Sequence, residues 1–360
     1  MNKSIIAVAL GMPLLFASCQ NQDVQHPDYI YQTVYFANQT PVQTITLGED
    51  GEFDTSMDNA HQFQIYATLG GVNTNKKNRW VDYVIDNSMV DRVLFEDDAP
   101  VKALPSSYYN ITSDSKRIYI NKGNIMGAID IQLTDAFFAD PETPNVTYVV
   151  PVRLVEASDS ILSGEVKDGI TSPDILNADD WSVLPKNYTL YGIKYKNRYH
   201  GAWLSRGTVT TDNNGEVTVN THEHEYWENE DIHYLTTVGL EKTGYEQTVA
   251  VPVKLADGTA GEEVLTCKVI LNTASDGTIT VSTDTPGFTA SGSGKYTYHG
   301  AGNAWGALER DQIVLDFTFS TDYVIDQTTG ATAKVSVSVK ETLVGRDRQN
   351  KFETFTYKMK

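Results

Sequence analysis

Apolar and polar residues alternate with a period of two along most of this chain. Because successive side chains of a β-strand point to opposite faces, this pattern predicts short, half-buried strands. In the first half the apolar positions are Val34, Phe36, Ile45, Leu47, Phe63, Ile65, Val81, Tyr83, Ile85, Val93, Phe95, Ile118, Ile120, Ile129, Ile131, Leu133 and residues 148–154. No segment there has a sustained helical stripe, so we expect a nearly all-β fold. Clusters of Gly, Asn, Asp and Pro between the runs favour an antiparallel sandwich.

Residues 157–185 differ from their surroundings, because they are rich in turn residues and show little alternation. This stretch predicts a linker between one domain over residues 29–156 and a second over residues 186–360. The second domain opens with residues 188–203, in which every second position from Tyr191 to Trp203 shares one face. We interpret them as two strand segments with a turn near Lys196 and Asn197.

Hairpin turn signals then follow in close succession at Asn214-Gly215, Asp257-Gly258 and Asp276-Gly277. Further alternating runs lie at residues 313–319, 335–339 and 352–357. Roughly eight antiparallel strands are enough to close a barrel whose interior can hold one small ligand. We therefore predict a C-terminal antiparallel β-barrel or a second sandwich.

The N-terminus has the order of a secretory signal. Lys3 precedes an apolar run over residues 5–16, and the small residues Ala17 and Ser18 precede Cys19. The segment is too short to span a bilayer, which takes about 20 apolar residues. Residues 15–19 resemble the lipobox of bacterial lipoproteins. The resemblance implies that residues 1–18 are removed, that Cys19 is acylated, and that residues 19–28 form a polar tether. The alternative is an ordinary signal that leaves Cys19 as a plain thiol.

The net charge and the cysteine content limit the classes of binding partner and the means of stabilisation. The formal net charge is −19, and it becomes −20 when Lys3 leaves with the signal. So acidic a chain is repelled by phosphate backbones, which argues against a nucleic acid partner. Beyond Cys19 the sole cysteine is Cys267, among apolar residues, so we expect a small buried side chain there and domains held without disulfides.

Several segments of the first half carry a family resemblance. Residues 104–109, the glycine-marked turn at 122–124, and the strands at 127–133 and 148–152 resemble an uncharacterised N-terminal module of Bacteroidetes lipoproteins. The resemblance covers about residues 28–156 and implies an immunoglobulin-like β-sandwich. It also implies a setting, since such modules occur in lipoproteins of glycan-utilisation loci. No hydrolase module follows here, so the resemblance implies no reaction.

A second resemblance lies at the start of the C-terminal domain. Gly201-Ala202-Trp203 resembles the Gly-x-Trp signature of lipocalin-like barrels. It implies a lipocalin- or calycin-like barrel whose bottom is closed by Trp203 beneath an arginine from the end of the chain, for which Arg346 or Arg348 is suitably placed. Residues 199–207 also resemble the start of the C-terminal domain in the same lipoprotein group. Under either interpretation Trp203 is structural.

Catalytic motifs are scarce. His222 and His224 are two apart and would share one face of a strand, so they could converge on a metal with His233. The segment fails the His-Glu-x-x-His template because Tyr226 stands where the second histidine belongs. A solvated edge strand explains it equally well. No Gly-x-Ser-x-Gly elbow appears, and we expect neither a metal nor a cofactor.

Aromatic residues beside polar loops are stronger candidates for a binding site than these motifs. Sugar rings stack on flat aromatic faces while Asp, Asn and Gln take the hydroxyl groups. Two clusters have this character, and they provide the candidate glycan-binding residues Tyr226, Trp227, Asn229, Tyr298, His299, Asn303 and Trp305. The alternative for each is an aromatic side chain that only packs in a core.

We therefore expect an outer-membrane, lipid-anchored lipoprotein at the cell surface. It would bind an oligosaccharide or polysaccharide as an accessory to a glycan-uptake system, next to outer-membrane transporter components. The first alternative is a lipid-anchored structural or adhesin protein, which predicts an exposed unpaired edge strand. The second is a glycan hydrolase, which predicts two carboxylates facing each other across a cleft.

Overall fold

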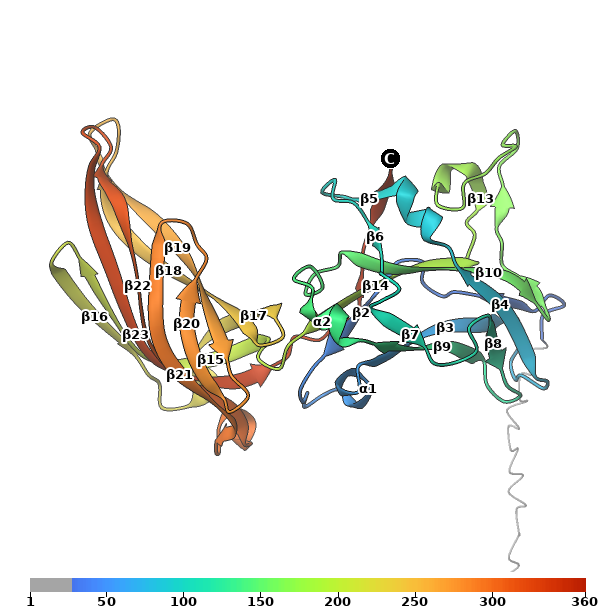
Figure 1. Cartoon of the computed structure of the whole chain (residues 1–360), viewed down its shortest axis with the longest axis horizontal. Helices are drawn as coiled ribbons and strands as arrows, with labels where there is room; N and C mark the ends of the chain where they lie inside the picture. Colours follow the sequence, from blue (N-terminus) through green and yellow to red (C-terminus); the bar gives the residue numbers. More distant parts are fainter. Residues whose placement is uncertain (1–27) are drawn as a thin grey trace, which may run out of the picture.

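The computed structural model describes residues 28–360, so the signal, Cys19 and nearly all of the tether lie outside the described residues. The protein is all-β and consists of two domains side by side (Figure 1), which confirms the predicted fold class. Its only helices are short: α1 (Ser56–Asn59), α2 (Asp135–Ala139), and the 3₁₀ turns η1 (Asn87–Arg92), η2 (Ala178–Asp180), η3 (Trp227–Asn229) and η4 (Trp305–Ala307), all within the described part. No helix in residues 28–360 is long and apolar enough to cross a membrane.

The first domain is a sandwich of two sheets. One sheet has the order β11 (Ser160–Ile161), β1 (Thr33–Tyr35), β3 (Gln62–Gly70), β9 (Met126–Leu133), β7 (Tyr109–Ile111). The other has the order β24 (Glu353–Thr354), β2 (Pro41–Thr46), β14 (Tyr188–Lys196), β10 (Tyr148–Ala157), β4 (Arg79–Ile85), β8 (Arg117–Ile120), with β6 (Lys102–Ala103) beside β10. Their facing apolar side chains, such as Ile45, Ile65 and Ile129, form one buried core. The alternation in the sequence is thus explained by strands with one face on this core.

The boundary between the domains differs from the predicted one. Strand β14 lies between β10 and β2 in the first sandwich, not in the second domain. Residues 157–185 do not connect the domains, because β11 returns to β1, and β12 (Glu165–Val166) pairs with β13 (Trp181–Val183) locally. The end of the chain also returns, since β25 (Tyr357–Met359) pairs with β5 (Val93–Phe95). Alternation along a strand says nothing about which sheet the strand joins, and that is why the prediction failed.

The second domain is a curled antiparallel sheet that closes on itself. Its order is β16 (Glu216–His222), β15 (Gly201–Asn213), β17 (Asp231–Gly239), β18 (Lys242–Lys254), β19 (Ala260–Thr273), β20 (Thr278–Thr283), β21 (Phe288–Ala301), β22 (Arg310–Asp326), β23 (Ala331–Asp347). Closure comes from the pairing of β15 with β23 over residues 202–213. The result is a barrel, one of the two predicted alternatives. The resemblance of this barrel to lipocalins stays a prediction, and so does the resemblance of the first domain to immunoglobulins.

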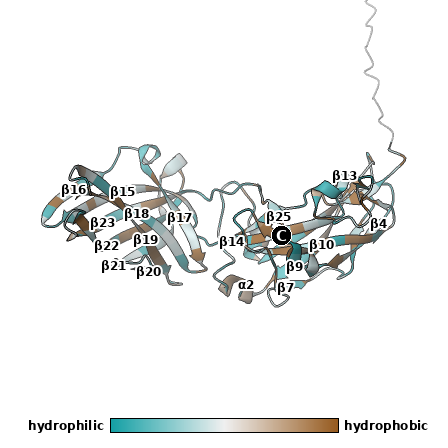
Figure 2. Ribbon diagram, turned by 90° about the horizontal axis from the view of Figure 1, so that it is seen from above, coloured by the Kyte–Doolittle hydropathy of each residue, from teal (hydrophilic) through white to brown (hydrophobic). Residues whose placement is uncertain are grey.

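The hairpin turns are where the sequence predicts them. Asn214 and Gly215 connect β15 to β16 with φ of 53° and 93°, the left-handed pair that a tight two-residue hairpin needs. Asp257-Gly258 and Asp276-Gly277 connect β18 to β19 and β19 to β20. Apolar residues run along the strands of both domains in Figure 2. Large side chains such as Tyr245, Phe317 and Phe319 fill the barrel interior, with Cys267 buried among them.

Two charged side chains hold the domains together where the chain crosses between them. The Arg348 guanidinium donates to the carbonyls of Leu47 (3.0 Å), Glu49 (3.1 Å), His200 (2.8 Å) and Asn197 (2.6 Å). The Lys196 ammonium donates to the carbonyls of Arg348 (3.1 Å) and Gln349 (2.8 Å). Because these bonds join first-domain loops to both crossing segments, the junction has a defined geometry.

Candidate functional site

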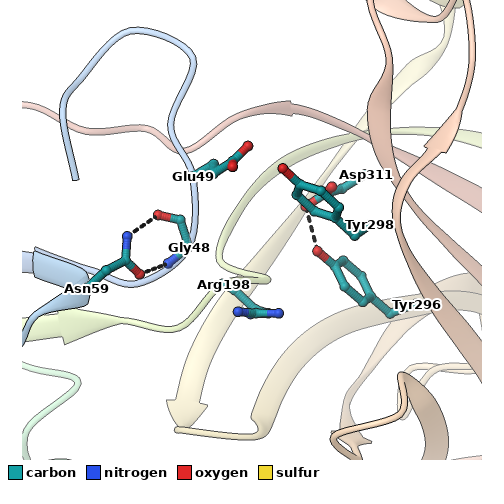
Figure 3. Close-up of a pocket in the computed structure, with 7 residues that line it drawn as sticks. All are labelled: Gly48, Glu49, Asn59, Arg198, Tyr296, Tyr298 and Asp311. Atoms are coloured by element: carbon teal, nitrogen blue, oxygen red, sulfur yellow. Dashed lines mark hydrogen bonds between the residues drawn. The ribbon is translucent and has the colours of Figure 1, made fainter. Parts of the chain in front are cut away.

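A cavity of about 400 Å³ lies at this junction, with walls from both domains. Figure 3 shows its lining residues: Gly48, Glu49, Asn59, Arg198, Tyr296, Tyr298 and Asp311. The first three come from the segment between β2 and β3, Arg198 from the crossing, and the others from β21 and β22. The site therefore exists only when the two domains are in contact.

Backbone geometry fixes the first-domain wall. The Gly48 N–H donates to Asn59 Oδ1 (2.8 Å), and Asn59 Nδ2 donates back to the Gly48 carbonyl (2.9 Å). Gly48 has a φ of +91°, and a Cβ there would lie 2.9 Å from Arg198 Cβ. Glycine is thus required both for the turn and for the close approach of Arg198.

Asp311 fixes the opposite wall. The Tyr296 hydroxyl donates to Asp311 Oδ2 (2.7 Å), and the His299 N–H donates to Asp311 Oδ1 (3.0 Å). Burial and this carboxylate raise the pKa of Tyr296 well above its usual value, so its hydroxyl stays a donor at neutral pH. Asp311 therefore holds the irregular part of β21, where pairing with β22 is interrupted between Thr297 and Ala301.

Three polar groups remain exposed in the cavity. Arg198 is exposed and forms no ion pair or side-chain hydrogen bond within residues 28–360, and its guanidinium lies between the two walls in Figure 3. The Glu49 side chain is 68% exposed. Tyr298 is 52% exposed, and a hydrogen bond to Glu49 raises the pKa of its hydroxyl. A cation, a carboxylate and an aromatic face are thus available to a ligand.

The structure places two of the predicted glycan-binding residues at this cavity. Tyr298 lines it, and His299 stacks on Tyr298 with ring centroids 4.0 Å apart and an interplanar angle of 16°. His299 Nε2 also lies 3.5 Å from Glu49 Oε2. Sequence reasoning missed Glu49, Asn59, Arg198 and Asp311, because no local pattern marks residues that only the domain contact brings together.

The two predicted aromatic clusters do meet, through η3 and η4. The Gly306 N–H donates to Glu228 Oε1 (3.3 Å), and Trp227 packs on Ala301, Ala304 and Val344. Arginine side chains cover the indole rings. The guanidinium of Arg206 lies 3.9 Å from the centroid of Trp227, and those of Arg310 and Arg346 lie 4.8 and 5.9 Å from the centroid of Trp305. These rings therefore mainly stabilise the loops beside the cavity.

The other predicted residues lie outside the junction cavity. Tyr226 is 59% exposed, and the Asn229 N–H donates to its carbonyl (3.1 Å). Asn303 occupies a turn with a φ of 50°. Trp227 instead lines a more open groove of about 470 Å³ on the outer face of the barrel, together with Arg206, Glu223, Asp316 and Lys340.

Gly201, Trp203 and Arg346 were predicted to close the barrel. A Cβ on Gly201 would lie 2.3 Å from the Asp347 carbonyl oxygen, so glycine permits the pairing of β15 with β23. Trp203 is buried, and its Nε1 donates to the Tyr199 carbonyl (2.9 Å). Arg346 directs its guanidinium to Trp305, while Arg348 binds the junction carbonyls. Trp203 pairs with Gly345 across β15 and β23, and its ring would lie 3.8 Å from a Cβ at Gly345.

The two candidate metal ligands, His222 and His224, contact different side chains. His222 Nε2 lies 3.2 Å from Ser205 Oγ, whereas His224 Nδ1 lies 3.2 Å from Glu230 Oε2. Within residues 28–360 no three His, Cys, Asp or Glu side chains are grouped so that they could hold a metal.

A buried polar cluster that the sequence did not reveal lies inside the barrel. Glu341 Oε2 accepts hydrogen bonds from Ser205 Oγ (2.9 Å) and the Tyr245 hydroxyl (3.0 Å), and that hydroxyl lies 2.5 Å from His233 Nδ1. Glu341 Oε1 is buried without a partner in the described structure. Burial raises the pKa of Glu341 to about 7.

Comparison with known proteins shows the family of this chain. A crystal structure of a protein of unknown function from Bacteroides ovatus is 34% identical, with a TM-score of 0.77 over 92% of this chain and 99% of that one. The chain belongs to the family of this Bacteroides protein. Within the family fold, the model of a domain of unknown function, DUF5627, matches residues 198–349, and another model, described as an N-terminal domain, matches residues 29–161. The first match begins at the crossing, where the structure also places the domain boundary.

More distant structures resemble the chain only loosely. One is an auxiliary nutrient binding protein from Bacteroides thetaiotaomicron, 12% identical with a TM-score of 0.38 over 84% of this chain and 90% of that one. Another is a multidomain protein from Bacteroides ovatus, 12% identical with a TM-score of 0.42 over 89% of this chain and 97% of that one. Likenesses this remote carry no argument about the function of this chain. No match was found among curated proteins.

Proposed function

We propose that this protein binds an oligosaccharide in the junction cavity, as a lipid-anchored accessory of a glycan-uptake system in the outer membrane. The observation that carries the proposal is the convergence of Arg198, Glu49 and Tyr298 on one cavity between the two domains. Its volume lies at the lower end of the range for small-molecule sites, roughly 300–1,000 Å³. That size suits the end of a glycan chain rather than its length.

The chemistry of the exposed groups fits sugar hydroxyls. A guanidinium donates two parallel hydrogen bonds, and a carboxylate accepts two, so Arg198 and Glu49 can each engage a pair of neighbouring hydroxyl groups. The half-exposed ring of Tyr298 offers an apolar face to the CH side of a pyranose. The lining has one cation, Arg198, and two carboxylates, Glu49 and Asp311, which disfavours an anionic sugar.

Glu49 and Asp311 both line the cavity, an arrangement that the hydrolase alternative requires. Both oxygens of Asp311 are already occupied, by the Tyr296 hydroxyl and the His299 N–H. This favours binding over hydrolysis, since a catalytic carboxyl group needs an oxygen that is free to reach the substrate.

The test is a glycan array with residues 20–360, followed by calorimetry on each hit. Arg198→Ala and Tyr298→Ala should each weaken binding at least tenfold, the loss expected for about 1.4 kcal/mol. Arg198→Lys keeps the charge but loses the planar fork, so it should also weaken binding. Tyr119→Ala removes a tyrosine of similar exposure (54%) on β8 and is the matched control. Binding that is indifferent to Arg198 and Tyr298, or release of reducing sugar, would contradict the proposal.

One observation favours the structural alternative. Strand β16 ends the order of its sheet, so one side of it has no partner strand among residues 28–360, and its Val217 and Val219 are 59% and 64% exposed. Such an edge can add a strand from another chain. If the protein assembles through it, the mass measured by light scattering will rise with concentration, and Val219→Lys will keep the protein monomeric. A monomer at every concentration would count against this alternative.

A further inference from the structure

Three segments meet at the end of the first domain where the described chain begins. The Tyr29 N–H donates to the Gly71 carbonyl (2.9 Å), and the Asn73 N–H donates to Asp28 Oδ1 (2.7 Å). Asn75 then bonds the loop after β8, because its Nδ2 donates to the carbonyls of Asn121 (3.0 Å) and Asn124 (2.9 Å). Residues 28–31, 71–78 and 121–126 thus form one surface, which we call the entry face. In Figure 1 it lies on the side of the first domain away from the second.

The entry face exposes apolar side chains that no described residue covers. Tyr29, Ile30 and Tyr31 are 77%, 95% and 77% exposed. On the neighbouring loop and strand, Ile125 and Met126 are 48% and 47% exposed. Tyrosine is enriched where protein meets the boundary of a lipid bilayer, because its ring is apolar and its hydroxyl is polar.

The charge of this face is opposite to that of the chain. The entry face contains Lys76, Lys77 and Lys122 and one acidic residue, Asp28, while the whole chain carries −19. Lys77 pairs with Asp159 at 3.2 Å. Lys76 and Lys122 are exposed and form no ion pair within residues 28–360. Free lysines beside exposed tyrosines are complementary to anionic lipid head groups.

If Cys19 is anchored in a membrane, the short tether keeps the entry face within reach of the lipid surface. Cys19 lies nine residues before Asp28, so the connection spans at most about 30 Å when fully extended. We propose that the entry face docks on an anionic lipid surface and orients the molecule, with the barrel and the junction cavity held away from the membrane. This inference rests on the lipid anchor of the proposed function, but it does not depend on sugar binding.

The experiment uses residues 20–360, which lack the acyl group, so that only the protein surface contributes. Co-sedimentation with vesicles of phosphatidylcholine mixed with phosphatidylglycerol should show salt-sensitive binding. The triple variant Tyr29→Ser, Ile30→Ser, Tyr31→Ser should lose most of it. The double variant Lys76→Gln, Lys122→Gln should lower binding to mixed vesicles by about fivefold per lysine, with little effect on pure phosphatidylcholine.

The control removes exposed apolar side chains from the second domain. The triple variant Val217→Ser, Val219→Ser, Tyr226→Ser changes residues that are 59%, 64% and 59% exposed, and it should bind vesicles like the wild type. Equal loss in both triples, or no vesicle binding by the wild type, would overturn the proposal and leave this face to a protein partner. Saccharide binding, measured on the same proteins, should be unchanged by the entry-face variants, so the two proposals can fail separately.

Discussion

Glu341 should make the stability of the barrel depend on pH in a way that one substitution removes. Burial raises its pKa from 4.5 to about 7, because Ser205 and Tyr245 supply two hydrogen bonds but no positive charge. A carboxyl with a raised pKa holds its proton more tightly in the folded state. Its favourable contribution is therefore complete below pH 4.5 and is lost as the pH rises through about 7.

The magnitude follows from the difference between the two pKa values. Each pKa unit corresponds to about 1.4 kcal/mol, so ionised Glu341 costs the folded barrel on the order of 3 kcal/mol at pH 8. Glu341→Gln keeps the shape and the two accepted hydrogen bonds but has no charge to bury. The variant should exceed the unfolding free energy of the wild type by less than about 1 kcal/mol near pH 5 and by about 3 kcal/mol at pH 8.

Urea unfolding between pH 5 and pH 8 measures this difference, with the fluorescence of buried Trp203 reporting on the barrel. Subtracting the wild-type curve from that of the variant removes the contributions of other titrating groups, including His233, whose pKa burial lowers. Glu309→Gln is the matched control, because the Glu309 side chain is 73% exposed. Parallel pH curves for Glu341→Gln and the wild type would refute the reasoning.

Two further substitutions test the barrel closure and the junction. Gly201→Ala should lower the unfolding free energy of the barrel by about 2 kcal/mol or more, since a Cβ there would lie 2.3 Å from the Asp347 carbonyl oxygen. The control is Gly215→Ala, which changes a glycine with open space around it and should lower the unfolding free energy less. Equal losses in the two variants would contradict the steric argument. Arg348→Met should leave four backbone carbonyls without their hydrogen-bond donor. Limited proteolysis should then cleave near residues 347–352, and saccharide binding should fall, while the circular dichroism spectrum of each domain stays the same. An unchanged cleavage pattern would show that the junction does not need this side chain.

The sequence by itself determined the features that depend on neighbouring residues. The period of two predicted strands, and Asn-Gly and Asp-Gly pairs predicted the hairpin turns, because both follow from backbone geometry over a few positions. The local segment around Tyr298 and His299 also marked part of the cavity from its composition alone. The all-β class was therefore accessible without a structure.

Only the tertiary structure decided which strands share a sheet and which side chains meet. Strand β14 lies between β10 and β2 of the first sandwich, but its alternating pattern would suit a strand of either domain, so the pattern could not assign it. The cavity joins Asn59 to Asp311 across most of the chain, and its cation, Arg198, is one of 28 Lys and Arg residues and has no distinctive sequence motif around it. Such groupings arise from the pairing of distant strands and from the contact between domains, and a local pattern carries no information about either.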